Sequence, residues 1–133
     1  MEQKLKHLEF IQGVINRLST NSFLLKGWSV VLVSALFALS AHDSSGKFIL
    51  LSFFPAIIFW GLDGYFLNLE RKYRVLYDNV REKNPKDIDF SMSTKDIDNG
   101  FIGWIKATFS RSLIPFHAVL IFAIILVMII QDL

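Results

Sequence analysis

Cysteine is absent from the 133 residues, and the chain also lacks room for a separate soluble domain. Without cysteine it has no disulfide, thiolate nucleophile or thiolate metal ligand. Three apolar runs take up 57 residues, and the longest stretch outside them, residues 68–112, holds 45. A stretch of that length is at the lower edge of what folds alone. The net charge of +2 is too small to indicate nucleic-acid binding.

The three apolar runs dominate the chain. They cover residues 23–41, 48–67 and 113–130 and contain 19, 20 and 18 residues. Helical residues rise about 1.5 Å each, so each run spans about 27–30 Å, the thickness of the hydrocarbon core of a bilayer. The sequence therefore predicts an all-α membrane protein with three transmembrane helices in the lipid bilayer.

Basic residues are distributed unevenly among the segments that flank these runs. Thirteen Lys and Arg residues lie before residue 27 or within residues 68–112, whereas the 42–47 turn has one and the tail after residue 130 has none. Positive residues favour the cytoplasmic side of a membrane. We therefore expect a cytoplasmic N-terminus and a periplasmic or extracellular C-terminus.

Two cytoplasmic segments are predicted to form amphipathic helices. Residues 1–22 have apolar side chains at helical spacing, which suits a helix in the headgroup plane or one packed on neighbouring helices. Polar residues 19–22 predict a cap or hinge before the first span, residues 23–41. Residues 84–100 are predicted to be a loop, and residues 101–112 an interfacial helix that leads into the third span.

The second span is predicted to continue beyond the membrane. Residues 68–83 contain neither Gly nor Pro, so we expect one helix over residues 48–83 that ends before Pro85. One face of the extension is suited to a cytoplasmic protein partner. It consists of Tyr73, Leu76, Tyr77 and Val80.

Three ionisable residues, Lys26, Asp63 and His117, lie three or four residues inside the cytoplasmic ends of the apolar runs. Antiparallel neighbours bring them to a similar depth, about 5–6 Å below the inner boundary. One hypothesis is an intramembrane polar cluster that lines or gates a pore and responds to pH through its histidine. The alternative is structural pairing, with Lys26 reaching the interface. No nucleophile–base pattern occurs, so we expect no enzyme and no cofactor or metal.

Small residues on the first two spans favour close helix packing. Gly27, Ser34, Ala38 and Ala41 lie on the first, and Gly61 and Gly64 lie on the second. Three thin helices bury little surface among themselves. We therefore expect a homo-oligomer.

Three segments together, residues 21–28, 59–73 and 87–92, resemble a group of small, mostly uncharacterised bacterial multi-pass inner-membrane proteins. The order of parts is also similar to that of SLATT-type membrane effectors of anti-phage systems, which carry an amphipathic helix, two spans and a charged cytoplasmic helix. This chain departs from them by its third span. The resemblance implies a bacterial inner-membrane protein that perforates the membrane when triggered.

Two functions are consistent with these features. The first is a homo-oligomeric, pore-forming or membrane-perturbing effector of defence type, with Lys26, Asp63 and His117 at the cytoplasmic entrance. The second is a non-catalytic adaptor or subunit that docks a cytoplasmic partner through the extension of the second span.

Overall fold

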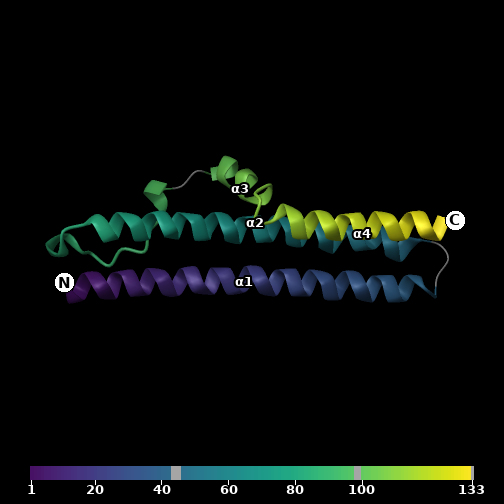
Figure 1. The fold of residues 1–133 in the computed structure, drawn as a ribbon, viewed down its shortest axis with the longest axis horizontal. Coiled ribbons are helices and arrows are strands. Elements are labelled where there is room, and N and C mark those ends of the chain that lie inside the picture. The colour runs from purple at the N-terminus through teal and green to yellow at the C-terminus, as the bar shows by residue number, and fades with distance from the viewer. Residues whose placement is uncertain (43–45, 98–99, 133) are drawn as a thin grey trace.

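The computed structural model describes residues 1–42, 46–97 and 100–132, and these ranges form helices joined by turns and short connections (Figure 1). They contain no strand, so the predicted all-α fold class is confirmed. The predicted 42–47 turn lies partly outside the described residues. The helices are α1 (Glu2–Ser40), α2 (Lys47–Glu82), α3 (Gly100–Thr108) and α4 (Ile114–Asp132), with 3-10 turns η1 (Pro85–Asp87) and η2 (Lys95–Ile97) between α2 and α3.

α1 and α2 form a long antiparallel hairpin, and α4 lies along the N-terminal half of α2 (Figure 1). α1, α2 and α4 are each long and apolar enough to cross a membrane, as predicted. Three such helices indicate a membrane protein. α1 has 39 residues and α2 has 36, so both are more than about 50 Å long and exceed the hydrocarbon core.

α1 differs from the prediction at residues 19–22. The expected cap or hinge does not occur there, because α1 is continuous from Glu2 to Ser40. Two polar side chains of this stretch bond elsewhere instead of ending a helix. Thr20 Oγ1 donates to the Asn16 carbonyl 3.0 Å away, and the Ser22 hydroxyl donates across to α2.

The hairpin has one apolar core near the N-terminus of α1. Leu8, Ile11 and Ile15 of α1 are buried there with Leu76 and Val80 of α2. The connection between α2 and α3 folds back over this core. The partly buried residues that pack against it are Tyr73, Tyr77, Ile88, Met92 and Ile97.

The face predicted to bind a partner is therefore filled within the chain. Leu76 and Val80 are buried, and Tyr73 and Tyr77 pack against the same core. The apolar side chains predicted for residues 1–22 supply the complementary surface, so the two amphipathic faces cover each other. A partner could reach this face only if α1 moved away.

His7 fixes the connection between α2 and α3 to α1. Its buried Nε2 donates to the Ser91 carbonyl 2.8 Å away. The Phe90 ring lies 5.5 Å from the His7 ring, although Phe90 has a φ of 56°, which side chains disfavour. The Ser91 N–H donates to Asp89 Oδ1 at 3.1 Å, and Lys83 Nζ lies 3.8 Å from the same oxygen. Both contacts lower the pKa of Asp89.

A second apolar core joins the three membrane-length helices. Val33 of α1, Ile49 and Ala56 of α2, and Leu120 and Ile124 of α4 are buried together. These five side chains carry no polar atom. The middle of the bundle is therefore filled mainly by hydrocarbon, although Ser29 of α1 and Ser52 of α2 are also fully buried.

The remaining boundaries follow from local chemistry. α2 ends at Glu82, one residue before the predicted end, and Pro85 follows it. α3 ends at Thr108, so it is shorter than the predicted 101–112 helix. Pro115 is in the first turn of α4, where a missing N–H costs little.

Candidate functional site

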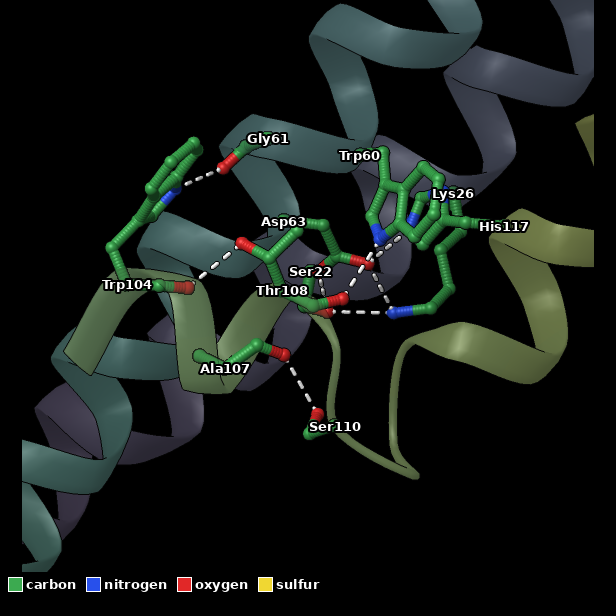
Figure 2. Close-up of polar contacts among 10 residues, drawn as sticks. All are labelled: Ser22, Lys26, Trp60, Gly61, Asp63, Trp104, Ala107, Thr108, Ser110 and His117. Atoms are coloured by element: carbon green, nitrogen blue, oxygen red, sulfur yellow. Dashed lines mark hydrogen bonds and ion pairs between the residues drawn. The ribbon is translucent and has the colours of Figure 1, made fainter. Parts of the chain in front are cut away.

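Asp63 lies at the centre of a polar network between the three membrane-length helices (Figure 2). It projects from α2, and its side chain is fully buried. An unpaired carboxylate in such a place would be costly, because little water can solvate it. The groups that contact Asp63 therefore decide whether the bundle tolerates it.

Two of those groups come from α1. The Ser22 hydroxyl donates to Asp63 Oδ1, and Lys26 Nζ lies 2.6 Å from Asp63 Oδ2. Lys26 Nζ also donates to Ser22 Oγ at 2.9 Å. Residues four apart share one face of a helix, so both side chains reach the same carboxylate. The Lys26 side chain is 22 % exposed, whereas the Asp63 side chain is fully buried.

The third group comes from α4. His117 Nε2 lies 2.8 Å from Asp63 Oδ2, and an ionised carboxylate only accepts hydrogen bonds, so Nε2 carries the hydrogen. The His117 ring stacks on Trp60, with ring centroids 5.7 Å apart and planes 7° from parallel. His117 Nδ1 is buried without a hydrogen-bond partner among the described residues. We call Ser22, Lys26, Asp63 and His117 the Asp63 network.

α3 packs beside this network through two indole hydrogen bonds (Figure 2). Trp60 Nε1 on α2 donates to the Thr108 carbonyl, and Trp104 Nε1 on α3 donates to the Gly61 carbonyl, each at 2.9 Å. Gly64 allows this contact. A Cβ at Gly64 would lie 2.0 Å from Thr108 Oγ1 and 3.1 Å from Thr108 Cα. Only glycine therefore fits this position with α3 in place.

The network is suited to joining helices rather than to bond-making chemistry. The Ser22 hydroxyl donates to the Asp63 carboxylate, which also contacts Lys26 and His117, so its oxygens are already engaged in holding the three helices together. A metal ion would find one carboxylate and one imidazole, with the Lys26 ammonium already on the same oxygen. With a neutral imidazole, the charges of Lys26 and Asp63 cancel.

The structure brings together the three polar residues predicted to share one depth, Lys26, Asp63 and His117. Sequence reasoning missed Ser22 and Trp60 as their neighbours. The spacing of four residues between Ser22 and Lys26 was a usable signal, because it places both on one helix face. The contact of Trp60 with α3 spans 48 residues of sequence, so no local pattern indicates it.

Comparisons with protein-family models, curated proteins and solved structures give no match to this chain. Its function is therefore inferred from the residues and contacts described above.

Proposed function

We propose that this chain is a homo-oligomeric protein of the bacterial inner membrane that permeabilises the bilayer in a gated manner. It would act as a pore-forming or membrane-perturbing effector of defence type, without an enzymatic step. The observation that carries the proposal is the ion pair between the partly exposed Lys26 and the fully buried Asp63. With His117, it ties the three membrane-length helices together at one level.

The Asp63 network supports a closed state that can open. Asp63 loses its compensating charge if α1 moves, and an uncompensated buried charge is strongly destabilising. The bundle then lowers its free energy by admitting water to the carboxylate. This network therefore has two arrangements in the proposal, closed and paired or open and hydrated.

Permeation requires more than one copy. The centre of a single bundle is filled by Val33, Ala56 and Ile124, so three helices enclose no aqueous path. Three small residues of α1, and Ala41 just after its end, are exposed and unused within the bundle, which supports close approach by a second copy. The three residues of α1 are Gly27, Ser34 and Ala38.

The orientation belongs to the same proposal. The excess of basic residues favours a cytoplasmic N-terminus and a cytoplasmic segment from residue 68 to residue 112, with the C-terminus on the opposite side. The Asp63 network then lies near the cytoplasmic boundary. The adaptor function is less well supported, because α1 already covers the face that would bind a partner.

Two measurements test the proposal. Native mass spectrometry of protein released from lipid nanodiscs reports the number of copies. Dye release from reconstituted vesicles reports permeation, with Lys26→Met as the opening variant and Lys86→Met as its matched control. Lys86 is exposed on the connection after α2, so its loss removes the same charge without touching the network.

We expect assemblies of five or more copies, and faster dye release from Lys26→Met than from wild type or Lys86→Met. The double variant Lys26→Met/Asp63→Asn removes both charges, so it should return to slow release. Monomers or dimers alone would overturn the proposal, because six spans with these faces cannot enclose a channel. Equal release from Lys26→Met and Lys86→Met would overturn it as well.

A further inference from the structure

α3 presents an apolar face away from the helix on which it packs. Phe101 and Ile102 are 69 % and 65 % exposed, whereas Gly103 and Ala107 are buried. We call the outward residues of this region the α3 outer face. It consists of Phe101, Ile102, Ile105 and Phe109, together with the exposed basic residues Lys106 and Arg111.

This face is held in a fixed position. The indole hydrogen bonds of Trp60 and Trp104 join α2 and α3 in both directions, and Gly64 admits Thr108 at close range. Large apolar side chains at a fixed, exposed site indicate a binding surface rather than a frayed segment.

We propose that the α3 outer face binds anionic phospholipids at the boundary of the bilayer. α3 is separated by five residues from α4, whose apolar length suits a membrane span. Trp60 contacts both Thr108 of α3 and His117 of α4, so the end of α3 lies level with the start of that span. The α3 outer face is therefore adjacent to the lipid-facing surface of the bundle.

Charge selects the kind of lipid. Residues 100–131 contain no Asp or Glu, and Lys106 and Arg111 form no ion pair with any described residue. Their ammonium and guanidinium groups are complementary to the phosphates of anionic headgroups. Phe101 and Ile102 suit the acyl chains just below those headgroups.

A second copy of the chain suits this face less well. A two-fold contact through this face would place Lys106 and Arg111 near the same basic residues of the other copy. α3 offers no acidic side chain to offset that repulsion. Anionic lipid satisfies both the apolar and the basic residues of the face.

The absence of cysteine allows a direct test with single spin labels. A nitroxide at Ile102→Cys is compared with one at Lys95→Cys, which is exposed on η2, in phosphatidylcholine vesicles with and without phosphatidylglycerol. We expect the label at position 102 to be relaxed by oxygen, which partitions into the lipid. The label at position 95 should instead be relaxed by a water-soluble paramagnetic reagent. Aqueous accessibility at position 102 would overturn the proposal. Spin–spin broadening there would overturn it too, by indicating a second copy.

Native mass spectrometry tests the selection of headgroups. Lys106→Gln/Arg111→Gln should lower the retention of phosphatidylglycerol relative to phosphatidylcholine by about fivefold or more. The control Lys86→Gln/Lys95→Gln removes the same charge from the connection after α2, and it should retain the wild-type preference. Equal preference in the two double variants would overturn the proposal. Neither measurement depends on whether the protein permeabilises vesicles.

Discussion

Replacement of Gly64 by alanine tests whether α3 is held against α2 as described. The added Cβ would lie 2.0 Å from Thr108 Oγ1, 3.0 Å from Thr108 Cβ and 3.1 Å from Thr108 Cα. A hydroxyl can rotate away, but the Cα belongs to the backbone of α3. α3 must therefore shift as a unit, and the indole hydrogen bonds of Trp60 and Trp104 must lengthen.

The expected loss of stability in Gly64→Ala follows from a comparison with two other glycines. Gly27 has no atom within 4 Å of an added Cβ, and at Gly61 the nearest atom, on the Trp104 ring, is 3.5 Å away. Alanine raises helix propensity by about 1 kcal/mol at all three positions, so this gain cancels in a comparison. Gly64→Ala should therefore be less stable than Gly27→Ala by about 1–3 kcal/mol, the usual cost of overpacking. Gly61→Ala should behave like Gly27→Ala.

Thermal unfolding in nanodiscs, followed by tryptophan fluorescence, measures this difference. Two of the three tryptophans, Trp60 and Trp104, lie in the contact between α2 and α3 and report on it directly. Adding Thr108→Ala to Gly64→Ala removes the nearest atom but leaves the Cβ, so stability should recover only in part. If Gly64→Ala and Gly27→Ala unfold at the same temperature, the close packing of α3 on α2 is refuted.

Two further predictions concern the connection between α2 and α3. His7→Leu removes the hydrogen bond to the Ser91 carbonyl, worth about 0.5–1.5 kcal/mol, so amide hydrogen exchange should quicken near Ser91 and stay unchanged in α4. Unchanged exchange near Ser91 would contradict the anchoring role of His7. The pKa of Asp89 is lowered in the folded chain. The ionised Asp89 therefore stabilises the fold at pH values above its usual pKa near 4, and this stabilisation is lost as the pH falls through the lowered pKa. Acid below pH 4 should therefore loosen this connection more in wild type than in Asp89→Asn, as measured by proteolysis, and equal loosening in both would contradict the prediction.

The three membrane-length helices were predictable because a single physical quantity identifies them. Continuous apolar length indicates a span, and the lack of Gly and Pro in residues 68–83 indicates that the second helix continues. The proximity of Lys26, Asp63 and His117 also followed from depth, since antiparallel spans bring residues near the same side of the bundle to one level. These predictions needed only the rise of a helix and the order of the segments.

The predicted hinge at residues 19–22 was wrong for a tertiary reason. Ser, Thr and Asn near the start of an apolar run are typical of a helix cap, because their side chains can replace a backbone partner. In this chain Ser22 has a partner on another helix, Asp63, which lies 41 residues away. The position of α3 against α2 could not be predicted from the sequence either, because it depends on the space that Gly64 leaves for Thr108.

The continuity of α1 matters for the proposed function. One straight helix carries Leu8, Ile11 and Ile15 in the first core, and Ser22 and Lys26 in the Asp63 network. A hinge between them would have let the N-terminal part move alone. Because there is none, a force that displaces the N-terminal part of α1 from α2 also withdraws both α1 groups from Asp63. His117 reaches Asp63 from α4 and cannot replace the lost positive charge while its imidazole is neutral. A trigger that acts on the first core would therefore open the Asp63 network without contacting it.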